Sequence, residues 1–310
     1  MSAKVTLIKR INAFEEALLL PQLINESAGD TPHNRSAALL RKGLGIVIFN
    51  ILEDFIKERT VEMFTSVSSS LTSFSYLPKE LQEAATLGAL RGLSNKAALE
   101  KKAQGNWLGL IHTESMNINS TSQVNGFTIS PFSLMSENSN IYAEDIPKAM
   151  KCLNIDGGWD TLQKISTLVN GGIPDLKQSY MNISTRRHRA AHVASFDYEH
   201  GWLKDAINEI FAIALSFDIA LTCRCRELHS KPAVMLMKSS IVSSLSCRFL
   251  IHNAQKNHFS EKLSLTAKKS VKNWSDIGAA IQNIAPKCIT NNEYLIVLNS
   301  QSRISNWYCG

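Results

Sequence analysis

The sequence predicts a mainly α-helical protein that carries a small α+β module towards its C-terminal end. Apolar residues recur at spacings of three and four through most of the chain before Glu227, as they do along one face of a helix. Short apolar runs that are typical of strands dominate the rest of the chain. We therefore expect a helical domain over residues 1–228 and a small basic α+β module over residues 229–310.

The composition is typical of a globular protein with a sizeable core. The chain has 310 residues, of which 44% are hydrophobic and 19% are charged. Its first residues lack the apolar region of a secretory signal peptide, and no run of about 18 apolar residues appears, so no membrane span is expected. The six cysteines are sparse and irregularly spaced, which favours free thiols in a cytoplasmic protein.

Start and stop signals divide the first 228 residues into helical segments. Three of the later segments begin at an aspartate, whose side chain can accept the free N–H groups of a first helical turn. Residues 111–142 are instead rich in Ser, Asn and Thr and lack periodicity, which predicts an irregular insertion. The predicted helices are Ala13–Leu23, Ser36–Val67, Lys79–Leu93, Asp145 to about Gly157, Asp160–Val169, a helix from Asp175 into a cluster of Arg and His, and His200–Leu221.

The C-terminal module differs from the rest of the chain in charge as well as in pattern. Residues 230–310 carry ten Lys and Arg against three Asp and Glu, a net charge of +7, whereas the remainder carries −1. Such a module either binds polyanions or is simply a solvated basic surface. Its predicted elements are strands at Val234–Met237, Ser246–Ile251 and Tyr294–Leu298 and a short helix at Trp274–Ile284.

Five basic or imidazole side chains crowd into seven positions at the end of the helix that starts at Asp175. They are Arg186, Arg187, His188, Arg189 and His192. Arginine offers forked donors that suit phosphate oxygens, and histidine both takes and gives a proton near pH 7. Together they supply what RNA cleavage by the 2′-hydroxyl needs, without a metal or other cofactor. The alternative is a solvated basic helix end, where cations are favoured.

The run Arg187-His188-x3-His192 resembles the Arg-x4–6-His motif of the HEPN superfamily (higher eukaryote and prokaryote nucleotide-binding domains). Members are bundles of four or five helices, and the order of helices here matches over roughly residues 1–225. The resemblance implies that Arg187 and His192 are catalytic and that His188, Arg186 and Arg189 bind the substrate. One position departs from the pattern, because many members have glycine after the histidine, where this chain has Val193.

The function implied by this resemblance is metal-independent endoribonuclease activity that leaves 2′,3′-cyclic phosphate and 5′-hydroxyl ends on RNA. The likeness is greatest to RNA-targeting toxins and phage-defence proteins, which implies an effector with an antitoxin or sensor protein as partner. A non-catalytic HEPN-type module that binds RNA, a nucleotide or a partner protein is the alternative, and a helical scaffold is a third reading. Cleavage and salt-dependent RNA binding distinguish the three.

Helix geometry separates the two motif residues within one chain. Five residues rotate an ideal helix by about 500°, so Arg187 and His192 should lie about 140° apart. In HEPN proteins two motifs typically face each other across a dimer, which implies a homodimer with a composite active site. The acidic pair Glu53 and Asp54 is expected to face solvent or to pair with nearby cations, or else to orient a motif arginine.

Two groups of residues have spacings that can suit a metal ion. His188 and His192 share a helix face at i and i+4, and Cys223 and Cys225 are close in sequence to His229. Arginines stand within or beside both groups, and their positive charge disfavours a cation. We therefore expect no metal site.

Overall fold

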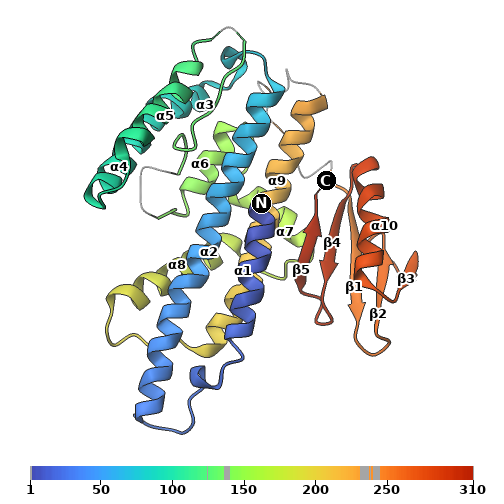
Figure 1. Ribbon diagram of the computed structural model, residues 1–310. Coiled ribbons are helices and arrows are strands. Elements are labelled where there is room, and N and C mark those ends of the chain that lie inside the picture. The colour runs from blue at the N-terminus through green and yellow to red at the C-terminus, as the bar shows by residue number, and fades with distance from the viewer. Residues whose placement is uncertain are drawn as a thin grey trace.

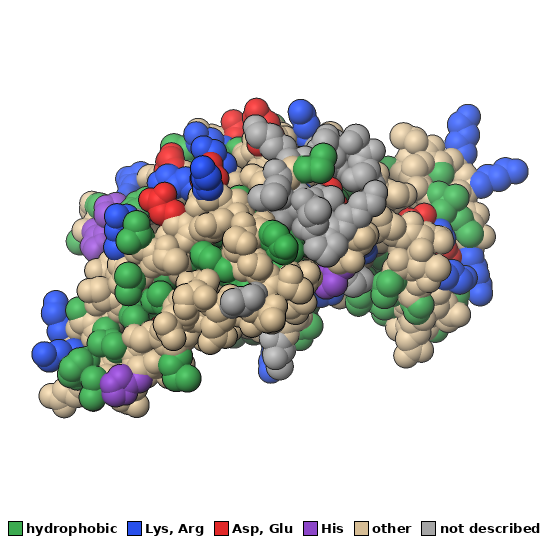
Figure 2. Space-filling view, turned by 90° about the horizontal axis from the view of Figure 1, so that it is seen from above, with side chains coloured by type: hydrophobic (Ala, Val, Ile, Leu, Met, Phe, Trp, Pro, Cys, Tyr) green, Lys and Arg blue, Asp and Glu red, His purple; other side chains and the backbone are tan. Residues whose placement is uncertain are grey.

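The computed structural model is a bundle of long helices with a five-stranded sheet on one side (Figure 1). Seen from above, the molecule is elongated, with helices at one end and the sheet at the other (Figure 2). The predicted strand at 234–237 lies outside the described residues except for Met237. The structure describes residues 2–123, 125–135, 140–230, 237, 239 and 245–309.

The helical part confirms the predicted mainly α fold. Its α-helices are α1 (Ala3–Ala17), α2 (Pro32–Ser70), α3 (Lys79–Glu83), α4 (Ala89–Lys102), α5 (Trp107–Ser120), α6 (Asp145–Cys152), α7 (Trp159–Leu168), α8 (Leu176–His192) and α9 (His200–Ser230). Short helical turns are η1 (Pro21–Leu23), η2 (Phe74–Tyr76) and η3 (Ala84–Gly88), of which η3 is a π-helical turn joining α3 to α4.

Helix α9 is the centre of the protein. Every residue from Ile210 to Arg224 is buried, so this helix is covered on all sides. Its length and composition would allow it to cross a membrane, but 89% of its most apolar window is buried inside the protein. A helix that is apolar all round and enclosed by other elements is a core helix.

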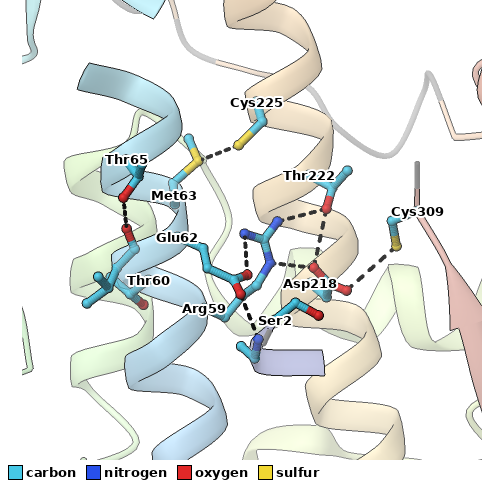
Figure 3. A network of polar contacts seen from close by, with 12 residues as sticks. Ser2, Arg59, Thr60, Glu62, Met63, Thr65, Asp218, Thr222, Cys225 and Cys309 are labelled. Atoms are coloured by element: carbon cyan, nitrogen blue, oxygen red, sulfur yellow. Dashed lines mark hydrogen bonds and ion pairs between the residues drawn. The ribbon is translucent and has the colours of Figure 1, made fainter. Parts of the chain in front are cut away.

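A buried ion pair joins α9 to α2 (Figure 3). The Nε of Arg59 lies 2.5 Å from Oδ1 of Asp218, and its Nη2 donates to the hydroxyl of Thr222. The other carboxylate oxygen of Asp218 accepts the indole N–H of Trp307 at 2.6 Å. Asp218 therefore holds together two helices and the last strand of the sheet.

The sheet has the strand order β3-β2-β1-β4-β5, in which β1 and β4 are parallel and the other pairs antiparallel. Phe249 and its neighbour Ile296 pack on the helical core, whereas Leu250 and its neighbour Val297 pack under α10. The sheet thus lies between α10 and the helical body. The elements are β1 (Cys247–Asn253), β2 (His258–Lys262), β3 (Lys272–Trp274), α10 (Ile277–Thr290), β4 (Tyr294–Leu298) and β5 (Ile304–Tyr308).

The prediction of an irregular insertion over residues 111–142 was wrong for its first part, because α5 continues to Ser120. The side chain of Asn106 caps this helix by accepting the N–H of Gly109. Its one buried residue is Glu114, which accepts the hydroxyl of Ser130 at 2.7 Å. A helix with no apolar buried face shows no apolar periodicity, and periodicity was the signal on which the prediction depended.

Candidate functional site

Helix α8 presents the cluster of Arg and His, and its two ends and one face are held firmly. The carboxylate of Asp175 accepts the N–H of Gln178 at 2.8 Å, as predicted for a helix cap. Tyr180 is buried against Phe49 of α2, and its hydroxyl donates to the carbonyl of Ile141 at 2.7 Å. These contacts set the rotation of α8 about its axis and hence the direction of each side chain in the cluster.

Arg187 is the member of the cluster that is directed towards α2. Its side chain is half-buried, and its Nε has no hydrogen-bond partner among the residues that the structure describes. The carboxylate of Glu53 on α2 lies close enough for the two charges to interact. An unpaired buried donor costs about 1–3 kcal/mol, so the Nε of Arg187 is available to donate to a bound phosphate.

Glu53 is the acidic residue that the structure adds to the site. Only 5% of it is exposed, and it accepts the N–H of Ile141 at 2.5 Å. Burial raises the pKa of its carboxyl, while the N–H of Ile141 and the charges of Lys57 and Arg187 act in the opposite direction. The pair Glu53 and Asp54 was predicted to face solvent or pair with cations, or else to orient a motif arginine. Asp54 is exposed and paired with Arg10 at 2.7 Å, whereas Glu53 is buried.

His188 and His192 lie together on the exposed side of α8. Their ring centroids are 4.7 Å apart with an angle of 49° between the planes, as expected for residues at i and i+4. The helix stays regular through His192, so the separation of about 140° from Arg187 applies. Val193 follows in an extended conformation with φ −111°, which any residue adopts, so this chain needs no glycine there.

Arg186 and Arg189 rest on aromatic rings rather than extending freely into solvent. The guanidinium carbon of Arg186 is 4.8 Å from the ring centroid of Trp202, and that of Arg189 is 4.4 Å from the ring of Phe196. Phe196, Tyr198 and Trp202 also contact one another. Sequence analysis missed this group, which we call the aromatic trio. Three aromatic residues within seven positions directly after the motif were the available signal.

The segment after the motif is anchored on α2. Arg41 is buried and donates from Nε to the carbonyl of Tyr198 at 2.7 Å and from Nη2 to Asp197 at 2.9 Å. The ring of Tyr198 lies against Gly45, where a Cβ would stand 2.2 Å from a ring carbon. Glycine is therefore required at this crossing. Burial raises the pKa of the Tyr198 phenol to about 12.

A cavity of about 580 Å³ opens directly beyond the end of α8. Ala194 and Ser195 line it after the helix, and Arg35 and Lys42 line it from α2. The ammonium group of Lys42 donates to the carbonyls of Val193 and Ala194. The volume of this cavity is within the usual range for a small-molecule site, about 300–1,000 Å³. The cavity begins two residues after His192.

The second candidate metal grouping is not assembled. The thiol of Cys225 contacts the sulfur of Met63 at 2.8 Å, and the Nδ1 of His229 is bonded to the backbone carbonyl of Cys225. Across the described ranges of the chain, no three His, Cys, Asp or Glu side chains are grouped so that they could hold a metal ion.

Comparison with known proteins places this architecture in a family. A family model described as RiboL-PSP-HEPN matches residues 7–222, from within α1 to within α9, and this region includes all five residues of the cluster. No curated protein and no solved structure matches the chain. HEPN domains are generally of the ribonuclease type, which agrees with the chemistry of the cluster. Because the match covers more than half of the chain, the protein belongs to the RiboL-PSP-HEPN family of the HEPN superfamily.

Proposed function

We propose that the protein is a metal-independent endoribonuclease whose active site is the cluster on α8. The observation that carries the proposal is the arrangement of that cluster. An exposed pair of imidazoles, His188 and His192, is followed by a cavity lined by Arg35 and Lys42, and a half-buried Arg187 lies near the carboxylate of Glu53. A toxin or antiviral-defence role, controlled by an antitoxin or sensor protein, is the part of the proposal that rests on the family alone.

The proposed reaction needs two proton transfers and one site for negative charge. One imidazole takes the proton of the 2′-hydroxyl, and O2′ then attacks phosphorus. The bond from phosphorus to O5′ breaks as a second imidazole protonates that oxygen, which leaves a 2′,3′-cyclic phosphate and a 5′-hydroxyl. His192 is the proposed base or acid, and Arg187 stabilises the charge on phosphorus. His188, Arg186 and Arg189 hold the phosphate in place.

The direct test is RNA cleavage in EDTA by the wild type and by the His192→Ala variant. We expect the wild type to release fragments with 2′,3′-cyclic phosphate ends, and the variant to lose at least about 10²-fold in rate. The matched control is His112→Ala, which removes an exposed imidazole from α5. Equal cleavage by His192→Ala and the control would rule out this mechanism.

The active unit in this proposal is a homodimer. Arg187 and His192 diverge within one chain, so a complete site needs a second copy. Helix α2 carries an exposed apolar stripe of Leu39, Leu40 and Val47, of which 71%, 48% and 46% are exposed. This stripe runs along the helix that packs against α8 and is suited to pairing with its own copy.

We expect the double variant Leu39→Glu/Val47→Glu to elute as a monomer and to lose most RNA cleavage, because opposed carboxylates would repel two copies. Size-exclusion chromatography with light scattering measures the mass, and the EDTA cleavage assay measures activity. Leu99→Glu is the control, since Leu99 on α4 is similarly exposed at 56%. A fully active monomer would contradict the composite site.

A further inference from the structure

Two of the three acidic residues of the C-terminal module are largely buried and paired within the protein, and the third is an exposed helix cap. Between residues 245 and 309 there are eight Lys and Arg against three Asp and Glu. Arg248 bridges two of these acids, lying 2.6 Å from Glu261 and 2.9 Å from Glu293, and all three side chains are largely buried. The third acid, Asp276, caps α10 by accepting the N–H of Ala279. Little negative charge is therefore left to balance the surface of the sheet.

The lysines, by contrast, are exposed and lie around one edge of the sheet. Figure 2 shows Lys and Arg side chains at the end of the molecule that the sheet forms, with few acidic side chains beside them. Strand β3 is the outermost strand on this side, and it pairs only with β2 among the described strands. Four exposed lysines stand in or next to β2 and β3: Lys256, Lys268, Lys269 and Lys272.

A row of rings crosses the same edge. Trp274 of β3 is the register partner of Phe259 of β2, which is in turn the partner of His252 of β1. The rings of His252 and Phe259 are stacked, with centroids 4.7 Å apart. Lys272 lies two residues before Trp274, on the same face of the strand, with its Nζ 3.8 Å from the indole centroid. All three rings are only partly buried: Phe259 and Trp274 pack against the small core under α10, and each keeps part of its surface exposed.

We propose that this edge of the sheet binds single-stranded RNA. The lysines contact phosphates, and bases stack on the exposed parts of His252, Phe259 and Trp274 that the packing under α10 leaves uncovered. The inference rests on the proposed function, because the bound strand is the substrate of the site on α8. A surface with lysines alone would bind any polyanion. Rings on neighbouring strands can instead stack with successive bases of one nucleic-acid strand.

The position of this edge determines which RNAs can use it. The sheet and α8 lie on opposite sides of α2 and α9 (Figure 1). A short oligonucleotide in the active site cannot reach the sheet, while a long RNA can occupy both. The edge should therefore strengthen binding and cleavage of long RNAs and leave a dinucleotide unaffected.

The test measures binding in the His192→Ala background, so that RNA is not consumed. The probe is a fluorescent single-stranded RNA of about 20 nucleotides, longer than the usual footprint of one such surface. We expect alanine at Lys256, Lys268, Lys269 and Lys272 to reduce the slope of log affinity against log salt by about 0.7 for each lysine that contacts a phosphate. Cleavage of a dinucleotide by the same variant with His192 intact should equal that of the wild type.

The matched control removes four exposed lysines from the helices, at Lys79, Lys96, Lys101 and Lys102. An equal loss of affinity in this control would show only the effect of net charge and would overturn the inference. The inference would also be overturned if the sheet variant bound RNA like the wild type. The same holds if the sheet variant lost binding only to vesicles of phosphatidylserine and phosphatidylcholine. If the wild type cleaves no RNA, the proposed ribonuclease function is wrong. The binding inference is tested separately, because the affinity measurement does not depend on cleavage.

The ring variant Phe259→Leu separates stacking from charge. Leucine keeps an apolar side chain under α10 but removes the aromatic face. We expect affinity for the RNA to fall by about tenfold with no change in the salt slope, while circular dichroism remains that of the wild type. A variant that folds normally and binds RNA unchanged would exclude the ring from the binding surface.

Discussion

Replacing Arg187 by alanine should slow RNA cleavage by about 10²- to 10³-fold, the loss typical when one donor to a charged transition state is removed. The geometry explains why this arginine matters more than its neighbours. Arg186 and Arg189 rest on the rings of Trp202 and Phe196. Arg187 has an unpartnered buried Nε among the described residues and the charge of Glu53 nearby. The negative charge of Glu53 favours this position of the guanidinium.

Single-turnover cleavage of a labelled RNA in EDTA measures this effect. Arg187→Lys should recover part of the lost rate, since lysine keeps the charge but not the forked donors. Glu53→Gln should cause a smaller loss than Arg187→Ala, because glutamine can still accept the N–H of Ile141 but carries no charge. Lys177→Ala removes an exposed cation from the first turn of α8 and is the control. If Arg187→Ala cleaves as fast as this control, Arg187 has no part in the reaction.

Replacing Asp218 by alanine is expected to lower the free energy of unfolding by about 3 kcal/mol, the lower end of the usual cost of removing one partner of a buried ion pair, because Arg59 keeps Glu62 as a more exposed partner at 3.3 Å. Only 11% of the Arg59 side chain and 6% of the Asp218 side chain are exposed. The substitution also removes the acceptor of the Trp307 indole N–H. Contacts between α2, α9 and the sheet would all be weakened by one change.

Urea denaturation followed by circular dichroism measures this loss. The control is Asp54→Ala, which breaks the exposed pair with Arg10 and should cost at most about 1 kcal/mol. The double variant Arg59→Met/Asp218→Leu should recover much of the stability lost in Asp218→Ala, because it leaves no unpaired buried charge. Equal unfolding midpoints for Asp218→Ala and Asp54→Ala would contradict the structural role assigned to this pair.

Local patterns were sufficient to predict the elements that carry the candidate site. Asp175 caps α8 as expected, and the motif occupies the end of that helix. The strand at Tyr294–Leu298 was predicted with the bounds that the structure has, because all five of its residues are buried and apolar or aromatic. Strand β2, with the sequence His-Phe-Ser-Glu-Lys, was missed because its side chains are mostly polar and half-exposed, and its pairing with β1 and β3 is what makes it a strand.

The sequence by itself determined the mainly helical fold, the basic C-terminal module and the cluster from Arg186 to His192, because each depends on residues that are close together in the chain. Tertiary structure alone decided what surrounds that cluster. Glu53 is buried near Arg187 because its carboxylate binds the backbone of Ile141, which is 88 positions away. Glu261 and Glu293 are likewise neutralised by their ion pairs with Arg248, which is distant from both in the sequence. Burial and pairing between distant residues depend on how the helices and strands pack. The spacing of residues within one segment of the chain therefore does not predict them.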